Sequence, residues 1–277
     1  MNMKKQAILK RLQEHYDLLT SYGYEVLAIF LQGSQNYNLD LEQEDYQSDI
    51  DSKAIILPTL DDLITGAPKA SRVYTDKYGA HVEVKDIRVM IEMWKKQNIS
   101  YLELLFTDYY IINPKYGVYA LGFMAIRDRV VHMNFPQLFR CISGMSKEKC
   151  HALEHIYPST EEKIAKYGYD GKQLCHIIRL NDLSKKLIRG VPYKDALWYE
   201  GGEVRETMIK AKLHEYSLEE ARNIAKIMDE ETLQIKNEVV AHFGDNAFDA
   251  RTYGDLESLT YELIKNYIID EIRKSAN

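Results

Sequence analysis

Two acidic residues separated by one position are the first candidates for chemistry. Asp49 and Asp51 begin the segment DIDSKAIIL, residues 49–57. Side chains two positions apart on a β-strand point to the same face, so the pattern predicts that these carboxylates converge. Carboxylates held that close repel each other unless a cation or hydrogen-bond donors lie between them. Mg²⁺ prefers hard oxygen ligands, and Mn²⁺ could replace it, so the pair indicates a divalent-metal site.

A glycine-serine pair supplies the second candidate. Gly33 and Ser34 come just after the apolar run VLAIFL, residues 26–31, which is typical of a strand buried on both faces. Glycine lets a phosphate approach the backbone, and the serine hydroxyl and nearby amides can donate to its oxygens. Either pair alone is more often an ordinary turn or a solvated strand end. Their combination in this order predicts a phosphate site beside a metal site.

The order apolar strand, Gly-Ser, polar loop and alternating Asp-apolar-Asp resembles the pattern of the DNA polymerase beta-like nucleotidyltransferase superfamily. The spacing between the two motifs is longer than usual, and the polar segment LEQEDYQ, residues 41–47, could absorb an insertion. The resemblance implies a metal-dependent transferase with a mixed-sheet catalytic core.

The same resemblance implies a third carboxylate on a later strand. In the alternating segment HVEVKD, residues 81–86, the candidates are Glu83 and Asp86. We favour Glu83, which lies between two valines. Asp86 lies where the strand gives way to a helix, and a helix N-terminal acid is the simpler interpretation of it. Lys53 shares the face of Asp51, where it could touch phosphate or only balance charge.

A second motif lies in the carboxyl-terminal half. Residues 166–190 resemble a bacterial and phage family of predicted nucleotidyltransferases, as does the segment QNISYLELLF, residues 97–106. Lys172, His176 and Arg179 share one helix face by their spacing. A solvated face would explain the spacing alone. With the resemblance, we expect Lys172 and Arg179 to contact triphosphate or acceptor, and His176 to donate a hydrogen bond or act in acid-base chemistry.

These residues must be positioned by elements that the hydrophobic spacing predicts. Strand-type patterns end before Pro114, and helical spacing dominates afterwards. The predicted fold class is therefore α+β: a polymerase beta-like mixed-sheet nucleotidyltransferase core in a catalytic domain, residues 1–115, followed by an all-helical substrate-binding domain, residues 116–277. The expected helices cover residues 4–21, 87–94, 117–133, 137–155, 172–189, 203–213 and 217–241, and the expected strands cover 26–31, 49–57 and 81–86.

Composition limits the partners. The net charge of −6 and the pI near 5.8 give no basic footprint, which argues mildly against a long nucleic-acid substrate. Three cysteines without metal-ligand spacing indicate neither a disulfide framework nor a zinc site. The basic amino terminus has helical spacing instead of the apolar core of a signal peptide, and no apolar run reaches about 18 residues. We expect a cytoplasmic protein without a membrane partner.

The predicted activity is transfer of a nucleoside monophosphate from a nucleoside triphosphate to a hydroxyl acceptor, with release of pyrophosphate. ATP is favoured as donor by its abundance. The acceptor stays open: an RNA end, a protein hydroxyl, a small molecule or a second nucleotide. An alternative is a nucleotide-binding sensor or partner-docking module without turnover. The predicted catalytic and metal residues are Asp49, Asp51 and Glu83, and the predicted nucleotide contacts are Gly33, Ser34, Lys53, Lys172, His176 and Arg179.

Overall fold

The computed structural model describes residues 3–43, 46–47, 49–244 and 247–276. The chain forms two compact units. The first unit comprises Met1–Asn36, Asp40–Met133 and Asp249–Asn277, and the second comprises Tyr37–Leu39 and Asn134–Phe248. Each unit has its own set of packed elements.

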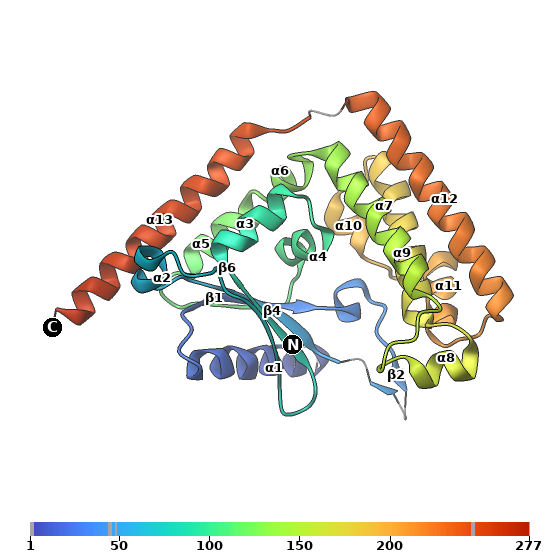
Figure 1. The fold of residues 1–277 in the computed structure, drawn as a ribbon, viewed down its shortest axis with the longest axis horizontal. Coiled ribbons are helices and arrows are strands. Elements are labelled where there is room, and N and C mark those ends of the chain that lie inside the picture. Colours follow the sequence, from blue (N-terminus) through green and yellow to red (C-terminus); the bar gives the residue numbers. More distant parts are fainter. Residues whose placement is uncertain (1–2, 44–45, 48, 245–246, 277) are drawn as a thin grey trace. The chain divides into compact units, whose positions relative to one another are not determined.

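A five-stranded mixed sheet forms the centre of the first unit (Figure 1). Its strand order is β5-β6-β4-β1-β7, and the bounds are β1 Val26–Gln32, β4 Asp51–Ile56, β5 Ser71–Thr75, β6 His81–Asp86 and β7 Tyr110–Ile112. β4 pairs with β1 antiparallel and with β6 parallel. β5 and β7 are the edge strands, and both pair antiparallel with their neighbours.

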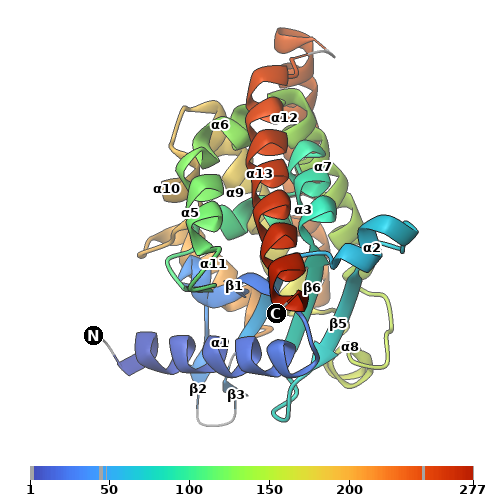
Figure 2. The ribbon, with the colours of Figure 1, turned by 90° about the vertical axis from the view of Figure 1, so that its left-hand side faces the viewer.

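Helix α1, Met3–Ser21, covers one face of this sheet and runs across the strands (Figure 2). It buries Ile8, Leu12 and Leu19 against Ile29 of β1 and Val84 of β6, together with their apolar neighbours. Each fully buried side chain of this kind contributes about 1.5–3 kcal/mol relative to exposure. The spacing of Ile8, Leu12, Tyr16 and Leu19 predicts this helix; Ile8, Leu12 and Leu19 are buried, but Tyr16 is half-buried and His15 is buried in addition.

The opposite face is covered by helices from later in the chain. α3, Ile87–Lys95, packs against β4 and β6, and α5, Gly117–Ala125, packs against β1. Trp94 of α3 is fully buried, its ring centroid 5.4 Å from that of Phe123 in α5. The short helices α4 Ile99–Leu102, η2 Glu103–Phe106 and α6 Arg127–His132 complete this layer. Helix α2, Leu60–Thr65, buries none of its side chains.

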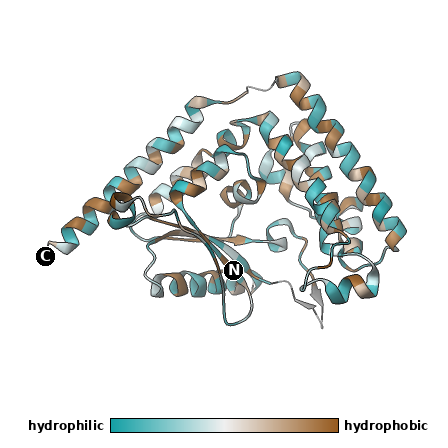
Figure 3. Ribbon diagram, viewed as in Figure 1, coloured by the Kyte–Doolittle hydropathy of each residue, from teal (hydrophilic) through white to brown (hydrophobic). Residues whose placement is uncertain are grey.

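The final helix returns to the first unit. α13, Ala250–Ser275, packs against α3, α5 and α6. The hydroxyl of Tyr253 donates to Glu92 at 3.0 Å, and that of Tyr116 donates to Asp270 at 2.9 Å. Hydrophobic residues recur along α13 in Figure 3, which fits a helix with one buried stripe.

The longer elements of the second unit are helices, within its described residues. α9, Gly171–Ile188, is its central helix and packs against α7, Phe135–Ala152, α11, Glu203–Lys212, and α12, Leu218–Phe243. α8 Glu161–Tyr167 and α10 Tyr193–Leu197 are shorter. Ser217 and Glu220 form a capping box at the start of α12, as their spacing predicts.

The α+β fold class is confirmed, with a mixed sheet early in the chain and helices after it. Most expected elements are present within a few residues of their predicted bounds. The predicted polar insertion contains the short antiparallel strands β2, Glu42–Gln43, and β3, Tyr46–Gln47, while positions 44 and 45 lie outside the described residues. Elements outside the predicted set include the strands β5 and β7 and the helices α2, α8, α10 and α13.

The compact units divide the chain at other places than residue 115. Residues 116–133 and α13 pack into the first unit, because they supply the layer that buries Trp94 and its neighbours. The division of catalytic and substrate-binding roles between domains 1–115 and 116–277 stays a prediction. Among the described residues, every helix is too short or too polar to cross a membrane.

Candidate active site

The Gly-Ser turn leaves the end of β1 and starts a short helical turn. Gly33 has a φ of 107°, a region that glycine adopts without strain. Ser34 begins the 3-10 helix η1, Ser34–Tyr37. The side chain of Asn36 donates to the carbonyl of Leu31 at 2.7 Å and accepts from the hydroxyl of Thr107 at 2.6 Å. These two bonds hold the turn against the strand end.

Strand pairing brings the Asp pair to this turn. In the antiparallel ladder of β1 and β4, Gln32 lies opposite Asp51. The side-chain amide of Gln35 donates to the backbone carbonyl of Asp49 at 2.9 Å. The two sequence motifs, separated by a long polar loop, are therefore neighbours at one end of the sheet.

The two aspartates have different surroundings. β4 begins at Asp51, so Asp49 precedes the strand and strand alternation does not govern its direction. Asp49 is exposed. Asp51 is half-buried, and its Oδ1 accepts a hydrogen bond from the backbone N–H of His81 at 2.8 Å. One oxygen of Asp51 is thus fixed by the neighbouring strand β6.

Glu83 lies on the same sheet face and is surrounded by donors. Its Oε2 is 3.1 Å from Nζ of Lys53, its Oε1 is 3.1 Å from Nζ of Lys85, and the hydroxyl of Tyr101 donates to Oε1 at 2.7 Å. Burial raises the pKa of Glu83, but the charge of Lys53 and the bond from Tyr101 outweigh it, so the net pKa is lowered. Both carboxylate oxygens already have cationic partners.

Lys53 is buried and is held in place by Glu83 and by neighbouring groups. It is 3% exposed, opposite Glu83 in the parallel ladder of β4 and β6. Its Nζ donates to the carbonyl of Ser100 at 3.3 Å and lies 3.9 Å from the ring centroid of Tyr101. Burial lowers its pKa more than Glu83 raises it. This environment favours the charge-balancing interpretation of Lys53 over a phosphate contact.

The donor set tests whether these residues suit a metal ion. Within the described part of the chain, groups of three or more His, Cys, Asp or Glu placed to hold a metal are absent. Mg²⁺ commonly binds through one or two carboxylates together with water and substrate phosphates. Asp49, which is exposed, and Asp51, which is half-buried, lie beside the Gly-Ser turn and are the two carboxylates available there. The convergence of the two carboxylates stays a prediction. Glu83 as arranged here does not fit a third ligand, because lysines occupy both its oxygens.

Asp86, the other candidate for the third carboxylate, begins helix α3. Its side chain accepts from the backbone N–H of Arg88 at 2.8 Å and pairs with the Arg88 guanidinium at 2.5 Å. It is 2% exposed. The interpretation of Asp86 as a helix N-terminal acid is confirmed.

Lys172, His176 and Arg179 all lie on α9 of the second unit. Lys172 is exposed, His176 is half-buried and Arg179 is buried. Burial lowers the pKa of His176 well below 6.5, and the positive charges of Arg179, Lys172, Lys149 and Lys212 lower it further. His176 is therefore neutral at pH 7, in a strongly cationic neighbourhood. The role of this face towards a nucleotide stays a prediction.

Cationic side chains of the second unit also hold Tyr37–Leu39, which sequence analysis did not anticipate. The guanidinium of Arg179 lies 4.3 Å from the ring centroid of Tyr37. Arg205 donates to the carbonyl of Asn38 at 3.0 Å, and Lys212 donates to that of Leu39 at 2.5 Å. The sequence carries no signal for these bonds, because they join segments more than 160 residues apart.

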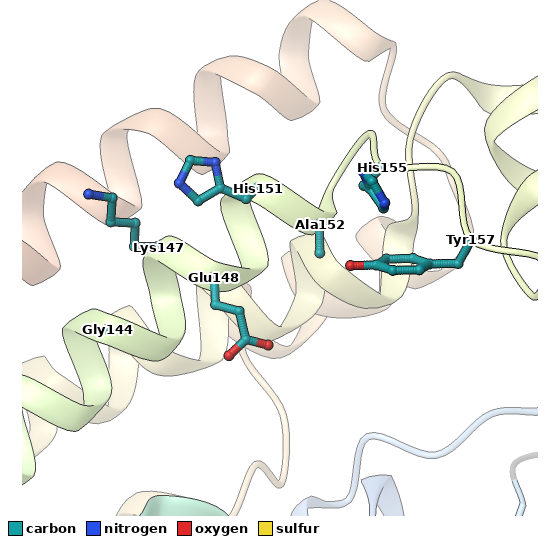
Figure 4. A pocket seen from close by; sticks show the side chains of 7 residues that line it. All are labelled: Gly144, Lys147, Glu148, His151, Ala152, His155 and Tyr157. Carbon is teal, nitrogen blue, oxygen red and sulfur yellow. The ribbon is translucent and has the colours of Figure 1, made fainter.

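An open pocket of about 400 Å³ lies on α7 and the loop after it (Figure 4). Its side chains include Glu148, His151, His155 and Tyr157, all exposed. None of the predicted site residues lines it. His155 packs against Tyr157 with ring centroids 4.4 Å apart, an ordinary aromatic contact.

No family model and no curated protein matches this sequence. A solved structure that resembles the fold is described as a nucleotidyltransferase-like protein from Exiguobacterium sibiricum. The two chains are 10% identical, and the match covers 95% of this chain and 91% of that one with a TM-score of 0.28. A likeness this weak does not establish a family or an activity, so the functional conclusion depends on this chain's own residues.

Proposed function

We propose that this chain is a nucleotidyltransferase, which transfers a nucleoside monophosphate from a nucleoside triphosphate, with ATP favoured, to a hydroxyl acceptor. Pyrophosphate is the second product. The observation that carries the proposal is the convergence of the Gly33-Ser34 turn and the Asp49/Asp51 pair at one end of the sheet. A phosphate-binding turn and a pair of carboxylates are the two parts that phosphoryl-group chemistry needs.

The turn would hold the triphosphate. The positive φ of Gly33 and the start of η1 at Ser34 leave backbone N–H groups and a hydroxyl at the strand end, and such donors favour phosphate oxygens. Asn36 keeps the turn in place through its bonds to Leu31 and Thr107. A fixed donor array lowers the cost of orienting the phosphate chain.

Asp49 and Asp51 would hold Mg²⁺, or Mn²⁺ in its place. When bound, the ion supplies positive charge to the phosphate oxygens. The backbone N–H of His81 fixes one oxygen of Asp51 and so orients the carboxylate. We assign Glu83 the role of charge partner to Lys53 and Lys85, because both its oxygens are paired.

A nucleotide-binding module without turnover is the second candidate. The observation that favours it is the pairing of Glu83, which leaves two carboxylates instead of three for metal binding. Asp49 and Asp51 would then serve nucleotide binding only.

One experiment separates the two candidates. Purified protein is incubated with each α-³²P-labelled nucleoside triphosphate and Mg²⁺, alone and with RNA, protein or small hydroxyl acceptors. We expect label transfer by the wild type and at least a 100-fold loss, about 2.7 kcal/mol of barrier, in Asp51→Asn. Asp49→Asn should have a comparable effect.

Asp61→Asn is the matched control, because Asp61 is exposed on α2 of the same unit and away from the strand end. It should transfer label at the wild-type rate. Mg²⁺-dependent nucleotide binding without transfer, across all acceptors, would favour the module without turnover. Absence of both binding and transfer would overturn the proposal.

A further inference from the structure

A buried histidine joins three parts of the first unit. His15 of α1 is 1% exposed. Its Nδ1 lies 2.9 Å from Oγ of Ser52 on β4, and its Nε2 lies 3.0 Å from Oδ2 of Asp76, at the end of β5. Ser52 is also 1% exposed. The same Asp76 oxygen accepts from Arg11 at 2.9 Å.

The donors and acceptors of this network follow from its charges. Burial lowers the pKa of His15, so its ring is neutral at pH 7. The Asp76 carboxylate can only accept, so the ring proton lies on Nε2. Nδ1 then carries the lone pair, and the hydroxyl of Ser52 donates to it.

Asp76 continues the network to the strand that touches Asp51. Its Oδ1 accepts from the backbone N–H groups of Tyr78 at 2.8 Å and Ala80 at 2.9 Å, which closes the turn between β5 and β6. The next residue, His81, donates its backbone N–H to Asp51 at 2.8 Å. Since Ser52 directly follows Asp51 and His81 directly follows Ala80, the hydrogen bonds and these two peptide links together form a closed ring that begins and ends at Asp51.

Sheet geometry separates this ring from the reaction side. Ser52 faces α1, whereas Asp51, one position earlier, faces the other side of the sheet together with Glu83. The bond from Ser52 to His15 therefore fixes the backbone next to Asp51 on the α1 face of the sheet, and the backbone N–H of His81 fixes the Asp51 carboxylate.

We propose that His15, Ser52 and Asp76 are positioning residues for Asp51. This inference rests on the proposed function. His15 fixes the start of β4 through Ser52 and fixes the β5–β6 turn through Asp76. Together these contacts set where the Asp51 carboxylate points. A shift of about 1 Å in such a group is enough to lower a rate strongly.

The same three residue types form the nucleophilic triads of hydrolases, but this arrangement cannot work in that way. The Ser52 hydroxyl is buried between α1 and β4, so an electrophile has no access to its oxygen. Nucleophilic catalysis requires the serine oxygen within reach of a substrate carbonyl or phosphorus. His15 therefore has a structural role: it links Ser52 to Asp76 by hydrogen bonds.

The test compares Ser52→Ala with Leu19→Val in the full chain. Leu19 is fully buried on α1 and its side chain has no hydrogen-bonding group, so the substitution removes side-chain packing and leaves the hydrogen bonds of the ring in place. We expect Ser52→Ala to lower kcat about tenfold, about 1.4 kcal/mol of barrier, and to raise the Mg²⁺ concentration for half-maximal rate. Leu19→Val should lower Tm without changing either quantity.

Two histidine variants provide a rescue. His15→Ala removes both contacts, whereas an asparagine at this position can place an amide nitrogen or oxygen near the former Nδ1 and bond Ser52 again. We expect His15→Asn to recover part of the kcat that His15→Ala loses. Equal kcat in these two variants, or an unchanged kcat in Ser52→Ala, would overturn the positioning role.

A ligand-free readout keeps this test independent of the proposed function. Hydrogen exchange at the backbone N–H of His81 reports its bond to Asp51 directly. We expect faster exchange at His81 in Ser52→Ala and wild-type exchange in Leu19→Val. Unchanged exchange in Ser52→Ala would refute the ring. Wild-type protein that transfers no label, with the exchange result as expected, would refute the nucleotidyltransferase proposal alone.

Discussion

Glu83 accepts contacts from three side chains, and two of them are cations. Lys53 is the more buried, with 4% of its side chain exposed, compared with 14% for Lys85. Removing one member of a buried ion pair leaves the other as an uncompensated charge, and this costs more than the pair itself contributes. A carboxylate in this position has a structural task whether or not it also touches a metal.

Glu83→Gln should therefore lower stability more than activity. The amide keeps the shape and can still accept from Tyr101, but it cannot balance the charge of Lys53. We expect the free energy of unfolding, measured in urea, to fall by about 2–3 kcal/mol, a moderate value because Glu83 is partly exposed. The kcat should stay within about tenfold of wild type. Lys85→Gln, which removes the more exposed partner, is the control and should cost less than 1 kcal/mol.

One result for Glu83→Gln would contradict this prediction. A Glu83→Gln variant that unfolds at the wild-type urea concentration but loses as much kcat as Asp51→Asn would show that Glu83 acts on the reaction. Lys53 and Lys85 would then have to release it when metal and nucleotide bind.

Asp76 gives the protein an acid-sensitive contact. Burial raises its pKa, but the bonds from His15 and from the backbone N–H groups of Tyr78 and Ala80 lower it more, to about 2. Because this value lies below the usual 3.8, ionised Asp76 stabilises the fold above about pH 4, and the contribution is lost as pH falls towards 2.

We expect Asp76→Asn to lower the free energy of unfolding by about 2 kcal/mol at pH 7 and by less at pH 3. Fluorescence of the buried Trp94 in a Trp198→Phe background would follow the first unit alone, because Trp198 belongs to the second. The same loss at pH 3 as at pH 7 would contradict the ionic role of Asp76.

At the scale of elements, hydrophobic spacing was enough for several elements that bury a regular apolar stripe, but not for α13, whose buried stripe includes the polar residues Thr252 and Thr260. The periodicities of α1, β6 and α3 predicted these elements because their buried residues follow the periods of a helix or a strand. β1 was predicted from a continuous apolar run instead, because it is buried on both faces. β5 escaped prediction because it is an edge strand with four of its five residues exposed, so no alternation marks it.

The site was predictable only where its residues lie close together along the chain. Gly33-Ser34 and the Asp pair carry recognisable motifs, and the β1–β4 pairing that joins them joins consecutive long strands. The pairing of Lys53 with Glu83 depends on the register of β4 against β6, which no local pattern reports. His15 was missed for the same reason, since its partners are 37 and 61 positions away.

Two helical glycines of the second unit should respond oppositely to alanine. A Cβ at Gly171, the first residue of α9, would lie 2.1 Å from the backbone carbonyl oxygen of Ala211 in α11. Gly144, within α7, has no heavy atom within 4 Å of the same position. Gly171→Ala must therefore push α9 and α11 apart, whereas Gly144→Ala only removes backbone freedom from the unfolded chain.

We expect Gly171→Ala to lower the free energy of unfolding by about 2–3 kcal/mol and Gly144→Ala to raise it by about 0.5–1 kcal/mol. Both values are measured by urea unfolding followed by circular dichroism. Hydrogen exchange in α9 and α11 should rise selectively in Gly171→Ala. A neutral Gly171→Ala would mean that the two helices can separate without loss, contrary to their close packing.

At the scale of the whole molecule, the second unit is largely an insertion in the first. The backbone N–H of Asp249 donates to the carbonyl of Met133 at 2.7 Å, so the chain leaves the first unit and returns to it at almost one point. Asn134 and Phe248, the next residues inward, form an isolated antiparallel bridge within the second unit. Tyr37–Leu39 is the exception among the segments of the two units, because it belongs to the second unit but lies between two segments of the first unit in the sequence.

The first unit should consequently fold without the insertion but not without its last helix. A chain of residues 1–133 joined through two glycines to residues 249–277 keeps the layer of α3, α5, α6 and α13, whereas residues 1–115 alone lose the partners of Trp94 and of Glu92. We expect the joined chain to unfold cooperatively, with dispersed amide NMR signals, and the 1–115 fragment to bind hydrophobic dyes and aggregate, as exposed core surface does. A cooperative unfolding transition in the fragment of residues 1–115 would show that α5, α6 and α13 are dispensable for folding, and it would favour the boundary at residue 115. An unfolded joined chain would instead show that the first unit needs the inserted helical residues in order to fold.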